Sequence, residues 1–198
     1  MNYFFSYTAR EEDANVNEDI NEVINKVKLG DTESYATIIR CFQRKIYLYC
    51  YYLLSSKEEA EDATQDIFIK GYNNLRNFTP TVSFSSWLYK IAYHHCMDLL
   101  KKRNKFLDLI FNYKKEKQQP IADQSSRYTD YVHDLLERLS LEERKILLLR
   151  ALEEYSFEEI ALIMDLKPAG VRKKYERLRK KLLAQKGGIQ SEQVYRHG

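Results

Sequence analysis

Glycine, proline and cysteine are scarce in this chain of 198 residues. Six Gly and three Pro make up about 5% of the chain, against roughly 12% in average usage. This deficit argues against turn-rich all-β folds and collagen-like segments, and it favours a helical protein with few long loops. The three cysteines, Cys41, Cys50 and Cys96, form no CxxC pair, so we expect a reducing, cytoplasmic compartment.

Long apolar runs and a charge excess are also missing. The longest apolar and aromatic run, Ile46 to Leu54, has nine residues, whereas a membrane-spanning helix needs about 20. We therefore do not expect an integral membrane protein, and the acidic residues at 11–13 are the wrong charge for a signal peptide. Lys and Arg total 32 and Asp and Glu total 29, so any electrostatic sign of a partner must be local.

Hydrophobic periodicity predicts an all-α protein with two small helical domains joined by a flexible linker. After a loose leader, 1–16, apolar residues recur at helical spacing from Asn17 and predict a first domain at 17–103, with a loop from Asn73 to Ser83. Residues 104–127 form the linker, a second domain follows at 128–186, and 187–198 is a tail. Gly187 and Gly188 are expected to end the last helix near Gln185.

The second domain carries the strongest local signal. Two capping boxes, Ser140–Glu143 and Ser156–Glu159, predict helix starts at 141 and 157, and Pro168 suits the first position of the last helix. A capped helix, a turn and a second helix make a helix-turn-helix. Residues 167–186 hold nine Lys/Arg and one acid, while 134–165 hold nine acids and four bases. This segregation of charge favours a last helix that contacts DNA phosphates.

Positions along that last helix suggest separate roles. Arg172, Lys173 and Glu176 lie on its first turns, where recognition helices reach base edges. Phosphate contacts are expected further along, at Arg177, Arg179, Lys180 and Lys181. Besides Arg179 and Lys181, the candidate DNA contacts are Lys167, Arg172, Lys173, Lys174, Glu176, Arg177 and Lys180.

Two surfaces of the first domain are further candidates. Asp62, Gln65, Asp66 and Ile69 form a stripe at spacing 0, 3, 4, 7, which suits a protein-docking face; from these residues alone an ordinary solvated face is favoured. A second stripe interleaves aromatic and cationic residues, as surfaces that stack unpaired bases do; from these residues alone, an amphipathic helix with a wet, tyrosine-rich face is favoured. Its members are Tyr89, Lys90, Tyr93, His94, Met97 and Lys101.

Catalytic and metal chemistry find little support. His94, His95 and Cys96 are adjacent, and Cys41 and Cys50 lie on a predicted core helix, so buried thiols and one surface histidine are favoured over a metal site. The sequence has no nucleophile elbow, phosphate-binding glycine loop or HExxH motif. We expect neither enzymatic activity nor a cofactor.

Three segments together resemble a known family. Ala60 to Tyr72 resembles region 2.2 of the extracytoplasmic-function (ECF) sigma factors of the sigma-70 family. Phe84 to Ala92, followed by Lys101-Lys102-Arg103, is similar to regions 2.3–2.4, and Tyr155 to Leu182 is similar to region 4.2. The resemblance extends over about 18–185, with the segments in order and suitably separated.

The resemblance implies an RNA polymerase initiation factor that acts under stress or envelope signals. Asp62, Gln65, Asp66 and Ile69 would dock on the clamp helices of the largest polymerase subunit, and the last helix would read the −35 element. The linker would thread through polymerase channels. An anti-sigma factor, often membrane-bound, is implied as a further partner beside core polymerase and promoter DNA. The −10 element would be captured and melted by Asn77, Thr79, Ser83, Tyr89, Lys90, Tyr93, His94 and Lys101.

Some positions depart from the family pattern, and two rival functions stay open. The family often has Asn where His94 stands and Gly where Asp165 stands, while Lys167 replaces a capping residue and Gly170 lies inside the recognition helix. One rival is a helix-turn-helix regulator that binds duplex operator DNA as a dimer without polymerase. The other is a helical nuclease, for which Asp62 and Asp66 are the closest carboxylate pair.

Overall fold

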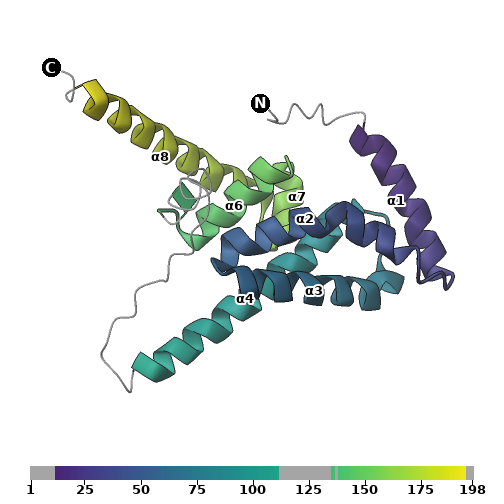
Figure 1. Ribbon diagram of the computed structural model, residues 1–198. Helices are drawn as coiled ribbons and strands as arrows, with labels where there is room; N and C mark the ends of the chain where they lie inside the picture. The colour runs from purple at the N-terminus through teal and green to yellow at the C-terminus, as the bar shows by residue number, and fades with distance from the viewer. Residues whose placement is uncertain (1–11, 112–134, 137, 195–198) are drawn as a thin grey trace, which may run out of the picture. The chain divides into compact units, whose positions relative to one another are not determined.

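The computed structural model describes residues 12–111, 135–136 and 138–194, and all regular structure in these ranges is helical (Figure 1). The chain divides into two compact units, Met1–Lys101 and Lys102–Gly198. This confirms the all-α prediction. The leader up to residue 11 and most of the linker lie outside the described residues. The elements are α1 (Glu12–Lys28), α2 (Tyr35–Leu54), α3 (Lys57–Asn74), the 3-10 helix η1 (Leu75–Asn77), α4 (Phe84–Phe111), α6 (Leu141–Leu152), α7 (Phe157–Met164) and α8 (Pro168–Val194).

The core of the first unit lies between α2, α3 and α4. α2 and α3 run side by side (Figure 1). Two buried pairs join α2 to α4: the rings of Tyr49 and Tyr89 meet edge to face at 5.2 Å, and the Sγ atoms of Cys50 and Cys96 are 3.7 Å apart. Amphipathic spacing explains the packing, because α2 buries the apolar side that the sequence places at intervals of three and four residues.

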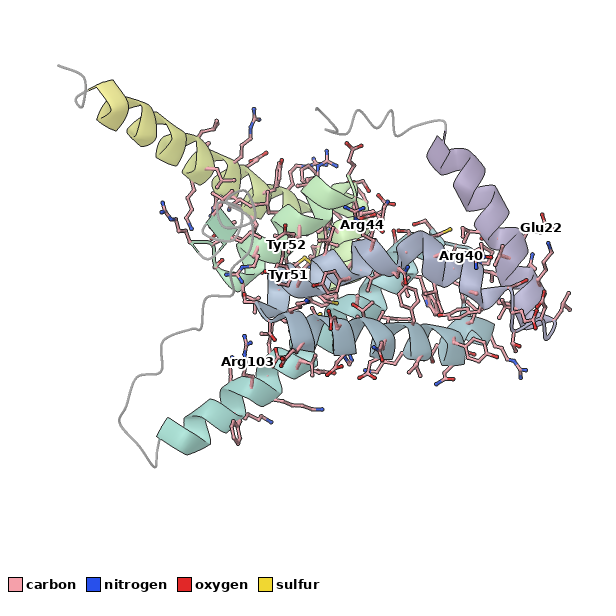
Figure 2. The ribbon with its side chains drawn as sticks, in the orientation of Figure 1. Glu22, Arg40, Arg44, Tyr51, Tyr52 and Arg103 are labelled. Atoms are coloured by element: carbon pink, nitrogen blue, oxygen red, sulfur yellow. The ribbon has the colours of Figure 1, made fainter. Side chains whose placement is uncertain are left out.

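Tyrosine and arginine side chains lie on the outer face of α2. Arg40 and Arg44 are exposed there, and Figure 2 shows them with Tyr51 and Tyr52 on the same helix. Tyr47 and Tyr51 are half-buried and stack on each other, with ring centroids 6.1 Å apart and ring planes 18° apart. These rings cover the helix without entering the core.

An aromatic cluster fixes the segment between η1 and α4, which we call the 78–83 loop. Phe78 is 3% exposed and its ring contacts Phe84 at 5.5 Å and Trp87 at 5.3 Å between centroids. Phe84 also contacts Phe42 of α2 at 5.6 Å. The loop therefore begins at a residue anchored in the core, while Thr79, the next residue, is exposed.

The second unit follows the capping signals of the sequence. Ser140 and Ser156 each form a complete capping box with Glu143 and Glu159, which confirms the predicted starts of α6 and α7. Asp165 ends α7 in the left-handed conformation with φ 53°, which an Asp tolerates. α6, α7 and α8 pack together and bury apolar residues from each helix, namely Leu149 of α6, Ile160 and Ile163 of α7, and Val171 and Leu178 of α8.

Several helices are longer than the sequence predicted. α1 begins at Glu12 rather than at 17, because acidic residues suit the positive end of a helix even without apolar periodicity. The segment from Asn73 that was expected to be loop continues α3 to Asn74 and then forms η1. α4 continues past 103 to Phe111, and α8 passes Gly187 and Gly188 to reach Val194. Glycine costs a helix only about 1 kcal/mol relative to Ala, so it weakens a helix without ending it.

Candidate functional site

The stripe on α3 is exposed as the sequence predicted. Asp62, Gln65 and Asp66 are exposed, and Ile69 keeps 59% of its surface accessible. Tyr72, one turn further on, is 39% exposed and extends the same face. Sequence reasoning missed Tyr72, although its spacing of three from Ile69 was the available signal. An exposed Ile and Tyr beside two carboxylates form a surface suited to a protein partner.

A buried histidine lies behind this stripe and connects it to α4. His95 is 6% exposed. Its Nδ1 is 2.5 Å from Nζ of Lys70, and its Nε2 is 3.6 Å from Oδ2 of Asp66. Since the Lys70 ammonium can only donate, Nδ1 accepts and the imidazole directs its other nitrogen towards Asp66. The α3 stripe and α4 are thus held together by a polar contact as well as by packing.

The start of α4 is capped by a residue that the sequence assigned to DNA. The Ser83 Oγ accepts from the Ser86 backbone N–H at 3.1 Å and donates to the Ser86 Oγ at 2.8 Å. Ser83 is half-buried, whereas Asn77 and Thr79 are exposed. Ser83 therefore fixes where α4 begins, and its DNA contact remains a prediction.

The predicted aromatic and cationic face of α4 is only partly exposed. His94 and Lys101 are exposed, Lys90 and Tyr93 are half-buried, and the rings of Tyr93 and His94 are 5.1 Å apart. The placement of Tyr89 and Met97 on this face was wrong, because Tyr89 is 0% exposed and Met97 is 9% exposed. α4 packs against both α2 and α3, so its buried arc is wider than a single apolar stripe indicates.

The last helix, α8, divides its cations between structure and surface. Lys174 is half-buried and its Nζ donates to Glu142 of α6 at 2.6 Å. Arg172 lies 3.6 Å from Glu158 and 5.5 Å from the centroid of the Phe157 ring, which also carries Arg150 at 5.3 Å. The other predicted DNA contacts are exposed, namely Lys167, Lys173, Glu176, Arg177 and Lys180.

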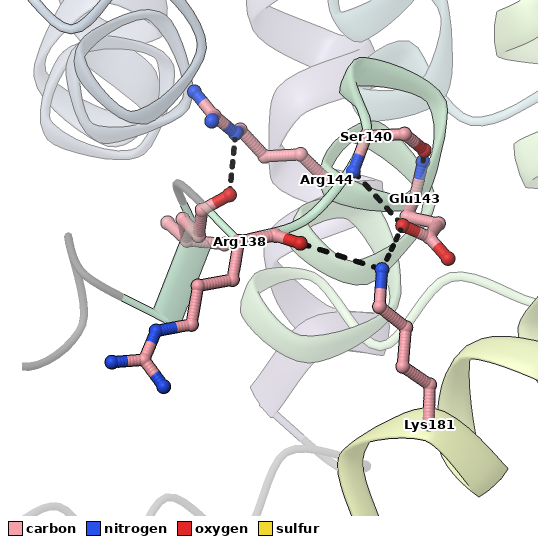
Figure 3. A network of polar contacts seen from close by, with 6 residues as sticks. Arg138, Ser140, Glu143, Arg144 and Lys181 are labelled. Atoms are coloured by element: carbon pink, nitrogen blue, oxygen red, sulfur yellow. Dashed lines mark hydrogen bonds and ion pairs between the residues drawn. The ribbon is translucent and has the colours of Figure 1, made fainter. Parts of the chain in front are cut away.

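A polar network anchors α8 to the start of α6 (Figure 3). Lys181 donates to Glu143 at 2.9 Å and to the Arg138 carbonyl at 3.3 Å, and Glu143 also accepts from the Ser140 N–H at 2.9 Å. The hydrogen bond from Lys181 lowers the pKa of Glu143 below its ordinary value of 4.5. Lys181, which the sequence assigned to phosphate, thus has a structural partner within the unit.

The cysteines are divided between core and surface. Cys50 and Cys96 are buried, and their mutual hydrogen bond together with burial raises the pKa of the Cys96 thiol. Cys41 was expected in the core but is exposed, because its position on α2 faces away from α3 and α4. Within the described residues, His, Cys, Asp and Glu do not gather in any group of three that could hold a metal ion. None of the helices in these ranges combines the length and apolarity needed to cross a membrane.

Comparison with known proteins matches each unit separately. The family "Sigma-70 region 2" matches residues 38–106 and "Sigma-70, region 4" matches residues 129–182. The chain is 39% identical over 84 residues to the ECF RNA polymerase sigma factor SigW of Bacillus subtilis, covering 42% of this chain and 45% of that protein. It is 26% identical over 175 residues to the RNA polymerase sigma-H factor of Pseudomonas aeruginosa, covering 82% of this chain and 91% of that protein.

Solved structures share the fold. CnrH, in complex with the cytosolic domain of CnrY, aligns with TM-score 0.62 and 17% identity over 84% of this chain and 96% of that one. The sigma factor RpoE, in complex with the anti-sigma factor NepR from Bartonella quintana, aligns with TM-score 0.64 and 20% identity over 76% of this chain and 94% of that one. With two sigma-70 regions matched in order on two helical units, the chain belongs to the sigma-70 family of RNA polymerase sigma factors, in its extracytoplasmic-function group.

Proposed function

We propose that this protein directs core RNA polymerase to a set of promoters and helps to open their DNA. The observation that carries the proposal is the pairing of two surfaces on the first unit. The exposed α3 stripe suits a protein partner, and Asn77, the 78–83 loop and α4 together offer amide, aromatic and cationic groups for DNA. A regulator that binds only duplex DNA needs neither surface.

Docking on polymerase is assigned to Asp62, Gln65, Asp66 and Ile69. Their carboxylates and amide would pair with polar groups of the polymerase, and burial of Ile69, now 59% exposed, would add apolar contact. Asp66 also faces His95 of α4, whose Nε2 lies 3.6 Å from its Oδ2.

Recognition of the −10 element is assigned to the 78–83 loop and the accessible part of α4. Asn77 and Thr79 present polar groups, and Tyr93 with His94 presents adjoining rings on which an unpaired base can stack. Lys90 and Lys101 supply positive charge for contact with the DNA phosphates. Tyr89 is withdrawn from this set because its side chain is buried.

Recognition of the −35 element is assigned to α8. Arg172 is exposed and its guanidinium lies over the Phe157 ring, which limits its rotamers before it reaches a base. Lys173 and Glu176 share the exposed start of the helix, and Arg177 and Lys180 follow towards the phosphates. Lys174 contributes mainly to stability through Glu142.

Regulation by an anti-sigma factor completes the proposal. RpoE and CnrH, which share the fold, were each solved bound to another protein, which for RpoE is the anti-sigma factor NepR. We place this protein in the cytoplasm, where such a partner would withhold it from polymerase until a stress or envelope signal arrives.

Run-off transcription with purified core polymerase tests the proposed function. The wild-type chain should produce promoter-specific transcripts, and Asp62→Lys with Asp66→Lys should abolish both transcription and co-purification with polymerase while helix content is retained. Glu61→Lys, an exposed position on α3 beside the stripe, is the matched control and should behave as wild type. Operator binding by a dimer without any polymerase association would favour the helix-turn-helix regulator instead.

A further inference from the structure

A lysine at the end of α1 reaches the first residue of the 78–83 loop. The Nζ of Lys28 donates to the Phe78 carbonyl at 2.6 Å and lies 5.6 Å from the centroid of the Phe78 ring. Lys28 precedes residue 38, where the match to sigma-70 region 2 begins. A residue outside the matched segment therefore holds the segment's loop.

Phe78 is the point at which the core gives way to exposed backbone. Its N–H bonds the Leu75 carbonyl of η1 at 3.1 Å, and its ring is buried against Phe84 and Trp87. Beyond it, Thr79, Pro80 and Thr81 are exposed. The direction in which the chain leaves Phe78 therefore determines where the loop presents its side chains, and the Phe78 carbonyl is the group that sets this direction.

α1 is itself fixed well enough to position the loop. Ile20 and Ile24 are each 2% exposed and Val27 is 8% exposed, and α1 packs against α2 and η1. Lys28 follows directly after this buried stripe and is half-buried. Lys26, two residues earlier, instead forms an ion pair with Glu22 at 2.9 Å on the surface of α1.

We infer that Lys28 is a positioning residue for promoter opening: it fixes the 78–83 loop through the Phe78 carbonyl in the conformation that captures an unpaired −10 base. This inference rests on the proposed function. A charge-assisted hydrogen bond is stronger than a neutral one, and a loop held in its binding conformation loses less freedom on capture. α1 thereby becomes part of the −10 reading unit.

The position of the loop can be measured without polymerase. Trp87 is the single tryptophan of the chain and its ring lies 5.3 Å from that of Phe78. Lys28→Met keeps the apolar stem but removes the donor, so acrylamide should quench Trp87 about twofold more strongly, whereas Lys28→Arg and the control Lys26→Met should match wild type. Unchanged quenching in Lys28→Met, with native helix content, would overturn the inference.

Strand opening is measured with the full chain and core polymerase. In permanganate footprinting, Lys28→Met should lower −10 thymine reactivity about tenfold, the order expected for loss of a charge-assisted hydrogen bond. Polymerase binding and −35 contacts should stay within twofold of wild type, and Lys28→Arg should restore opening. Normal opening by Lys28→Met would overturn the positioning role.

Three other cases are separable. If Lys28 contacted a phosphate directly, Lys28→Met would lower affinity for all sequences, reduce the salt slope by about one and leave Trp87 quenching unchanged, which contradicts the inference. If wild type itself failed to open promoters with polymerase, the proposed function would fail, while the quenching experiment would still report on the Lys28 contact. If Lys28→Met did not fold, Lys28→Gln, which keeps a donor on a shorter stem, would be compared with Lys26→Gln in both assays.

Discussion

Each of the two units of this protein is stabilised internally by a different kind of interaction. The first relies on buried aromatic and apolar packing, centred on Phe42, Phe78 and Phe84. The second combines buried apolar residues with ion pairs between α8 and α6, such as Lys174–Glu142 and Lys181–Glu143. In the first unit, most of the side chains proposed to contact polymerase or DNA lie outside this cluster, although Ser83 also caps α4. In the second, one cationic helix supplies both the ion pairs and the proposed DNA contacts, so its stability and its proposed function depend on the same kind of side chain.

The largest expected effect tests the aromatic core of the first unit. Phe84 is 2% exposed and contacts Phe42, Phe78 and Trp87. Phe84→Ala should lower the free energy of unfolding by about 3–5 kcal/mol, measured by urea denaturation with Trp87 fluorescence. Phe106→Ala, at a position 63% exposed, is the control and should cost little. A loss below 1 kcal/mol for Phe84→Ala would show that the cluster is not the centre of stability.

Glycine substitutions compare the packing of the two units. A Cβ at Gly71 would lie 2.9 Å from the Tyr35 Oη, which donates to the Phe68 carbonyl at 2.7 Å. Gly71→Ala should therefore destabilise the first unit by about 1–3 kcal/mol. At Gly170 nothing lies within 4 Å of a Cβ, so Gly170→Ala should stabilise α8 by up to about 1 kcal/mol. Thermal melting of both variants checks the opposite signs, and equal signs would refute the contrast.

Substitutions on α8 separate base reading from charge. Arg172→Ala should cost about 1–3 kcal/mol and relax preference at one −35 base pair. Lys180→Ala, at an exposed position, should weaken all sequences alike and lower the salt slope by about one. Binding of polymerase–protein complexes to −35 variants at two salt concentrations measures both. Unaltered base preference in Arg172→Ala would mean that α8 enters the groove in another register.

The smallest expected effect is on how stability changes at acid pH, through the Lys181–Glu143 contact between α8 and α6. The Lys181 hydrogen bond lowers the pKa of Glu143 below 4.5 in the folded state. Its contribution to stability is therefore present above pH 4.5 and is lost as the pH falls through the lower folded value. Lys181→Met should cost less than about 1 kcal/mol at pH 7 and remove this part of the acid sensitivity. Hydrogen exchange of α6 in the full chain, corrected for intrinsic rates, should show this difference between wild type and Lys181→Met. Equal acid sensitivity in the two proteins would mean that the acid-dependent loss of stability arises from another group.

Local features were predictable from the sequence because neighbouring residues determine them. Ser140 and Ser156 cap helices through residues three positions away, and the left-handed Asp165 follows from its place in a short turn. The exposed stripe on α3 was predictable for the same reason, since helical spacing alone sets which residues share a face.

Features that depend on the packing of two helices could not be predicted from neighbouring residues in the sequence. Tyr89 was expected on the exposed face of α4 but is buried, because α2 and α3 both pack against α4. Hydrophobic periodicity indicates only one buried face of a helix. The contact of Lys28 with Phe78 joins residues 50 positions apart, and that of Lys174 with Glu142 joins residues 32 apart. Both need the three-dimensional arrangement of helices whose individual sequences contain no sign of the pairing.

The three thiols differ in exposure, so a thiol-reactive label can be attached to the native chain at one position. Cys41 is accessible on α2, whereas Cys50 and Cys96 are each 0% exposed. A maleimide dye should therefore react at Cys41 alone while the fold persists, without the removal of any native cysteine. Single molecules labelled in this way would reveal how long the protein stays with polymerase after a transcript has begun.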